Sequence, residues 1–182
     1  RCGENELRTL RKKLDVENIE LQIINLPLGH PGEALGGDSV GLVPPENWKK
    51  AVAVDGKKFT GISIHDEALK ENISAVKAIS DWGYSKIFLD DDFRLAKGWD
   101  IGGCFCDIHQ KAFCDKFGYN KAEWTQLFDD IQNRCLSDVL ENWINFHCDE
   151  LTDFYRKLEN AVPSDEIGIM VACKVAERFG IR

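Results

Sequence analysis

The sequence predicts an α/β fold in which parallel strands are joined by crossover helices. Short apolar runs of strand length alternate along the chain with amphipathic segments of helical period. A Gly- and Pro-rich segment, residues 29–47, follows the first apolar run, and loops of that length inside compact domains usually carry function. With 182 residues, 43% of them hydrophobic, the chain suits one packed unit and at most two small ones.

The spacing of apolar residues predicts the elements of the first half in order. A helix is expected over residues 4–14, because leucines recur there three and four positions apart. A buried strand should cover residues 21–28, with Pro27 marking its end. Residues 51–64 alternate around Asp55 and Gly56, which indicates a hairpin or a strand preceded by a short excursion. The next helix should follow residue 65 and end near Gly83.

The second half continues the alternation. A strand is expected over residues 86–89 and a helix over residues 107–116. Asn120 and Glu123 have the spacing of a capping box, which predicts the start of another helix. A long helix should cover residues 135–161, ended by Pro163, before a final buried strand over residues 167–173.

Composition excludes several classes of protein. A net charge of −8 argues against nucleic acid as a partner, since phosphate binding needs clustered Lys and Arg. No apolar run approaches the roughly 20 residues that a bilayer span needs, and no leader opens the chain, so no membrane partner is expected. The seven cysteines do not form the framework of a secreted domain, which favours reduced thiols in the cytoplasm. Because the chain begins at Arg1 and its one methionine is Met170, we expect a fragment of a longer protein.

Three consecutive aspartates follow the strand expected over residues 86–89, in the text IFLDDDFR. In parallel α/β folds the working residues lie at such strand ends. Asp90, Asp91 and Asp92 repel one another, so at least one should have a raised pKa and could act as a general acid, while Arg94 holds another ionised. The alternatives are a helix cap with a structural ion pair to Arg94, or a magnesium site.

The text GGCFCDIH offers ligands for a metal. Cys104, Cys106 and His109 form the pattern C-x-C-x-x-H, and two thiolates with an imidazole suit tetrahedral zinc. Cys114 and Cys2 are the candidates for a fourth ligand. The competing interpretation is that the cysteines are small buried hydrophobic residues and that the histidine is a cap or faces solvent.

The segments FLDDDFRL and GGCFCDIHQKAF resemble the fourth strand and following loop of the beta-galactosidases of glycoside hydrolase family 42. The chain is similar also to uncharacterised barrel proteins grouped with the glycoside hydrolases, which pair a G-x-S-x-H strand (Gly61, Ser63 and His65 here) with DDDFR and GCFC. The resemblance covers residues 61–117. The sequence departs from family 42 in having aspartates where that family has Asn-Glu, and His109 where it has a third cysteine.

The resemblance implies that residues 1–182 are part of a (β/α)8 (TIM) barrel. It places Asp91 or Asp92 as the catalytic acid/base and implies that Cys104, Cys106 and His109 hold a structural zinc. It also implies that the strand end before the second helix, His65 with Asp66, lines a sugar pocket, although these two residues suit a helix start equally well.

Further residues are candidates for binding substrate: Asp90 and Arg94 beside the acid, His30 in the Gly- and Pro-rich loop, and Trp99, which with Trp48 could stack on a sugar ring. A histidine in such a loop is more often simply solvated. His147, on the apolar stripe of the long helix, is expected to be a core residue.

The predicted function is hydrolysis of an oligosaccharide or glycoside. Four strands make half a barrel, so the remainder of the barrel or a second copy of the chain should complete the core and supply the second carboxylate. Two alternatives stay open: a noncatalytic zinc-stabilised module that binds a sugar or a protein, and a hydrolase that depends on a divalent metal.

Overall fold

A computed structural model describes residues 3–29, 45–90, 93, 95, 102–163 and 165–170. Its centre is a three-stranded parallel sheet in the order β1-β4-β5, made of β1 (Ile23–Asn25), β4 (Lys86–Leu89) and β5 (Glu166–Ile169). Asn25 pairs with Leu89 and Leu89 with Ile169, so the three strands end side by side. Three of the four predicted strands are parallel, although regular pairing in the first is limited to Ile23–Asn25, and the strand predicted at residue 61 is not part of this sheet.

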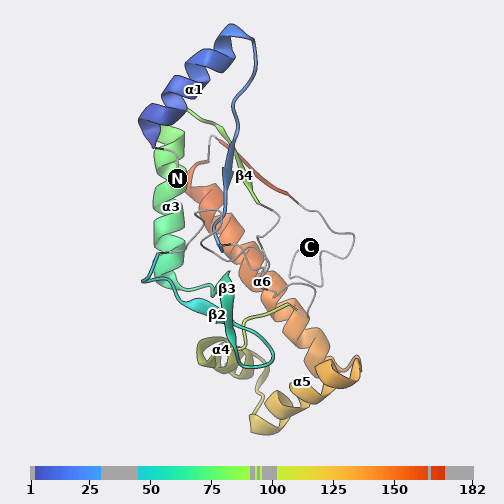
Figure 1. The fold of residues 1–182 in the computed structure, drawn as a ribbon. Coiled ribbons are helices and arrows are strands. Elements are labelled where there is room, and N and C mark those ends of the chain that lie inside the picture. Colours follow the sequence, from blue (N-terminus) through green and yellow to red (C-terminus); the bar gives the residue numbers. More distant parts are fainter. Residues whose placement is uncertain are drawn as a thin grey trace.

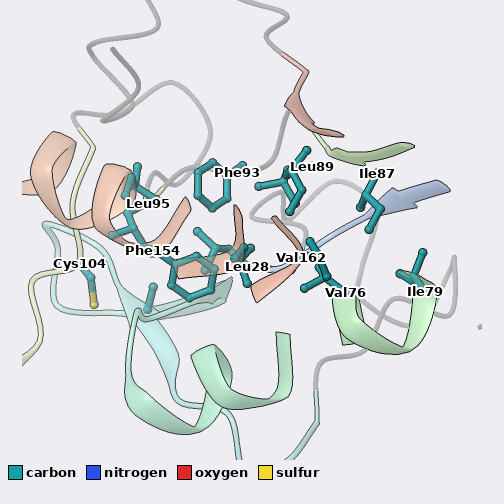
Figure 2. Packing of buried hydrophobic residues seen from close by; sticks show 14 of the residues in the cluster. Leu28, Val76, Ile79, Ile87, Leu89, Phe93, Leu95, Cys104, Phe154 and Val162 are labelled. Atoms are coloured by element: carbon teal, nitrogen blue, oxygen red, sulfur yellow. The ribbon is translucent and has the colours of Figure 1, made fainter. Parts of the chain in front are cut away.

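Helices α1 (Glu4–Val16), α3 (Asp66–Asp81) and α6 (Asp138–Ala161) pack with this sheet around one core (Figure 1). Helix α6 runs diagonally from the sheet to the far end of the molecule, where α5 lies. Ile87 and Leu89 of the central strand are fully buried, because they lie in the core that these helices share. Figure 2 shows this main core, with Cys104 at one end and Ile79 and Ile87 at the other.

Strands β2 (Lys50–Val52) and β3 (Lys58–Ile62) form a separate antiparallel pair around Asp55 and Gly56. The predicted hairpin is therefore confirmed. The Ile62 amide donates to the carbonyl oxygen of Leu28 at 2.8 Å, which ties the end of β3 to the segment that follows β1.

Helices α4 (Asp107–Phe117) and α5 (Lys121–Asn133) pack with the start of α6. Asn120 accepts from the Ala122 amide at 2.7 Å, and Glu123 accepts from the Asn120 amide at 2.8 Å, as the capping box predicts. A second group of buried residues, the aromatic core, fills this end of the molecule; it consists of Phe105, Phe113, Leu127, Val139, Leu140, Trp143 and Phe146.

The prediction that the chain is part of a (β/α)8 barrel is wrong. In such a barrel each strand pairs in parallel with the next strand of the chain. Here β1 pairs directly with β4, and β3 pairs antiparallel with β2. The described residues form a small α/β domain instead. The prediction failed because the hydrophobic pattern and a local motif can locate strands but cannot show which strands pair with each other.

Several boundaries differ from the expected ones. The long helix starts at Asp138 rather than residue 135, because the Ser137 side chain accepts from the Leu140 amide and caps it. The last strand covers Glu166–Ile169, so Met170 lies outside it, and residues 171–173 of its predicted range lie beyond the described residues. Within the described ranges, no helix has both the length and the apolar character that crossing a bilayer requires.

Candidate metal centre

The backbone of residues 102–106 runs beside β2 and fixes Cys104. The Phe105 amide donates to the Val52 carbonyl oxygen at 2.9 Å, and the Val52 amide donates to the Cys104 sulfur at 3.4 Å. These two hydrogen bonds attach residues 104 and 105 to the edge of β2. Cys104 is consequently fully buried and held on a rigid backbone.

Gly103 lets this segment lie against the aromatic core. Its φ of +133° is a conformation that residues with a Cβ rarely adopt, and an added Cβ would lie 2.7 Å from the Trp143 ring. The Trp143 indole donates to the Gly102 carbonyl oxygen at 3.2 Å. The ring of one α6 residue therefore sets the position of the segment that carries Cys104.

Cys106 and His109 are placed by the start of α4. Cys106 is the N-cap residue, and His109 follows one turn later, so both side chains lie on the same side of the helix. The Cys106 sulfur is 3.1 Å from Nδ1 of His109.

The ligand atoms of Cys104, Cys106 and His109 all lie within 4.8 Å of one another, and the three residues could hold a metal ion. Of the predicted metal ligands, Cys114 is not in this group. It lies five residues beyond His109, which on a helix is about 140° around the axis, and it packs against the aromatic core instead.

The two thiols of the group differ in acidity. The hydrogen bond from Cys104 lowers the pKa of Cys106, and the hydrogen bond from His109 lowers it further. The hydrogen bond to Cys106, and then burial, raise the pKa of Cys104. The arrangement therefore favours a Cys106 thiolate and a protonated Cys104. A bound cation would displace the remaining proton, because metals take cysteine as thiolate.

Glu150 of α6 faces the other side of the His109 ring. Its Oε2 lies 3.7 Å from Nε2 of His109, while Nδ1 of the same ring points at the sulfur of Cys106. Burial raises the pKa of Glu150. Metal-binding histidines usually present their second nitrogen to a carboxylate, which orients the ring. Sequence reasoning missed Glu150, although a carboxylate bordering the apolar stripe of a helix was a signal.

Ser63, the first residue after β3, was also missed as a site residue. Its Oγ lies 3.4 Å from the Cys104 sulfur, 3.5 Å from Nδ1 of His109 and 3.8 Å from the Cys106 sulfur. The alternation of Gly61, Ser63 and His65 indicated that these three share one face of a strand. What the alternation did not indicate is that this face meets the cysteines.

No family model, curated protein or solved structure matches the chain. The donor atoms themselves therefore carry the assignment of this site. The resemblance to glycoside hydrolase family 42 stays a prediction, as does the predicted cytoplasmic location.

The other predicted site residues lie apart from this group or beyond the described ranges. His65 is the N-cap residue of α3 by position, and its side chain bonds elsewhere: Nδ1 to Glu67 Oε2 at 2.7 Å, while Nε2 accepts from the Lys49 amide at 2.9 Å. Asp66 is exposed in the first turn of that helix. The described residues do not include Cys2, His30, Asp91, Asp92, Arg94 and Trp99.

Asp90 and Trp48 are described. The Asp90 amide donates to the Asn25 carbonyl oxygen at 3.0 Å, which places Asp90 at the carboxyl edge of the parallel sheet. The indole of Trp48 donates to Glu71 at 2.8 Å, so this ring is tied to α3.

His147 is a core histidine, as predicted. It is fully buried, its ring centroid lies 5.5 Å from that of His109, and neither of its nitrogens has a hydrogen-bond partner among the described residues. Burial, and then His109, holds its pKa well below the usual value.

Proposed function

We propose that this chain is a zinc-binding α/β domain, in which Cys104, Cys106 and His109 hold a structural zinc ion. One observation carries the proposal: the three ligand atoms lie within 4.8 Å of one another. The ion would link the segment beside β2 to the start of α4, and through Glu150 to α6.

The donor set selects the metal. Two sulfurs and an imidazole nitrogen suit zinc, whereas magnesium and calcium take oxygen ligands. The second nitrogen of His109 has a carboxylate 3.7 Å away, which is the environment of a coordinating histidine.

Burial favours a structural role over a catalytic one. Cys104 is 0% exposed and His109 2%, whereas Cys106 is partly exposed, so two of the three ligands are enclosed by protein. Catalytic zinc keeps an open coordination position, whereas structural zinc is enclosed by protein. A structural ion contributes its binding free energy to folding.

The experiment is elemental analysis of the reduced, purified chain, combined with thermal unfolding with and without a chelator. We expect one zinc per chain in the wild type and less than stoichiometric zinc in Cys104→Ser. Free zinc at 1,000 times its Kd adds about 4.1 kcal/mol of stability. For a chain of this size that corresponds to roughly 8–16 °C in Tm, which chelation should remove from the wild type but not from Cys104→Ser.

Cys135→Ser is the matched control, because Cys135 is exposed and lies outside the three-residue group. It should keep both the zinc and the response to the chelator. A wild type without zinc, or loss of zinc in Cys135→Ser to the same extent as in Cys104→Ser, contradicts the proposal.

A second candidate function is glycoside hydrolysis, which one observation favours. Asp90 lies at the carboxyl edge of the parallel sheet, where α/β enzymes place their working residues. The proposed acid, Asp91 or Asp92, follows it directly in the sequence. Hydrolysis of aryl glycosides should be lost in Asp91→Asn or Asp92→Asn and kept in Asp81→Asn at the end of α3. A wild type that cleaves no aryl glycoside in a broad panel contradicts this function.

A further inference from the structure

We infer that the hydroxyl oxygen of Ser63 is the fourth ligand of the proposed zinc ion, which makes the site Cys2HisSer and fills its fourth coordination position. The inference rests on the proposed function and assigns the position that three ligands leave open.

The three distances from the Ser63 hydroxyl fit the edges of a tetrahedral site. Bond lengths of about 2.3 Å to sulfur and about 2.0–2.2 Å to nitrogen or oxygen require tetrahedral edges of roughly 3.4–3.8 Å. Ser63 Oγ lies 3.4 Å from the Cys104 sulfur, 3.8 Å from the Cys106 sulfur and 3.5 Å from Nδ1 of His109. The edge between Cys106 and His109 is 3.1 Å, so a bound ion would lengthen it by about half an ångström.

The environment of Ser63 leaves little room for a water ligand. Ser63 is 2% exposed, and its hydroxyl stands at the position that an exchangeable water occupies in a catalytic zinc site. All three of its side-chain contacts that the structure gives are to the proposed ligands. A serine oxygen coordinates through its lone pair, as the hydroxyl of a P-loop serine does with magnesium.

The backbone around Ser63 is fixed before any metal binds. Its amide donates to the Lys49 carbonyl oxygen at 2.9 Å, and the preceding amide, of Ile62, donates to Leu28 at 2.8 Å. The fourth ligand therefore belongs to the β2–β3 pair. An ion bound by all four residues would attach that pair to α4 by coordination as well as by packing.

The test uses cobalt(II) as the probe, since it takes the place of zinc and absorbs visible light in tetrahedral sites. We compare wild type, Ser63→Ala and Ser63→Cys, after far-ultraviolet circular dichroism has shown that each variant is folded. Ser63→Ala should weaken cobalt binding by about ten- to a hundredfold. Ser63→Cys should bind cobalt more tightly, and its thiolate-to-cobalt charge-transfer band should rise in the ratio of three thiolates to two.

Ser74→Cys is the control, because Ser74 lies on the exposed face of α3 and bonds only to the Lys70 carbonyl oxygen among the contacts given for it. Its charge-transfer band should equal that of the wild type. If Ser63→Cys also keeps the wild-type band, and Ser63→Ala the wild-type affinity, Ser63 is not a ligand although the three-ligand site stands. A wild type that binds neither cobalt nor zinc overturns the proposed function, and this inference with it.

Discussion

Replacement of Gly103 by alanine should destabilise the protein far more than the same change at Gly118. Both glycines have a positive φ, +133° at Gly103 and +69° at Gly118. They differ in what a new Cβ would meet. At Gly118 nothing lies within 4 Å, whereas at Gly103 two Trp143 ring atoms lie at 2.7 Å and an atom of His147 lies at 2.8 Å.

The cost at each site follows from these distances. Gly118→Ala carries only the backbone term of a left-handed residue, about 1–2 kcal/mol. Gly103→Ala carries a backbone term of about 1–3 kcal/mol and an overpacking term of about 1–3 kcal/mol. The Trp143 ring has little room to move, because it packs against the rings of Phe105 and Phe113, whose centroids lie 4.7 Å and 5.1 Å from its own. The total at Gly103 is therefore roughly 2–6 kcal/mol.

Urea unfolding followed by circular dichroism measures both costs on the same chain, with the slope against denaturant as the check that two-state behaviour is kept. Gly103→Ala should also bind zinc more weakly than Gly118→Ala, since Cys104 is its neighbour in the chain. Equal free energies of unfolding for the two variants would refute the argument that the Trp143 ring determines the backbone at Gly103.

Three further results are expected. Asn72→Ala should lower the free energy of unfolding by about 1–3 kcal/mol, because the buried amide donates to the Pro27 carbonyl oxygen at 3.0 Å; the exposed Asn133→Ala should change it by less than about 0.5 kcal/mol, and equal losses would contradict the role of burial. Asn120→Ala should cost about 1 kcal/mol by removing the cap of α5, as thermal unfolding can show; an unchanged Tm would refute the cap. His147 has a folded-state pKa below its unfolded value of about 6.5, so its contribution is complete above that pH and is lost as the pH falls. Below pH 6.5 the wild type should lose up to about 1.4 kcal/mol per pH unit that His147→Leu does not lose, and parallel pH profiles would count against this.

The elements themselves could be predicted from the sequence because their signals are local. The Asn120–Glu123 box marked the start of α5, Asp55-Gly56 marked the turn of the hairpin, and the long apolar stripe marked α6. Capping, turn chemistry and helical period each depend on residues that are close together in the sequence, so a short stretch of sequence is enough to show them.

The candidate metal-binding group could be predicted for the same reason. Cys104, Cys106 and His109 lie within six consecutive residues, and Cys106 with His109 span one helical turn. The four atoms around the proposed ion were not predicted as a set, since Ser63 is 41 residues from Cys104 in the chain.

Strand pairing and the contacts between residues far apart in the sequence could be seen in the tertiary structure alone. It paired β1 with β4 rather than with the strand at residue 61, and so removed the barrel. It brought Glu150 of α6 to the far side of the His109 ring and placed the Ser63 hydroxyl among the ligands. Strand partners and side-chain neighbours at long sequence separation depend on how the whole core packs, and no short stretch of residues contains that information. Local signals in the sequence predicted the helices, the turns and the Cys104–Cys106–His109 group, whereas packing decided the sheet and the residues that surround this group.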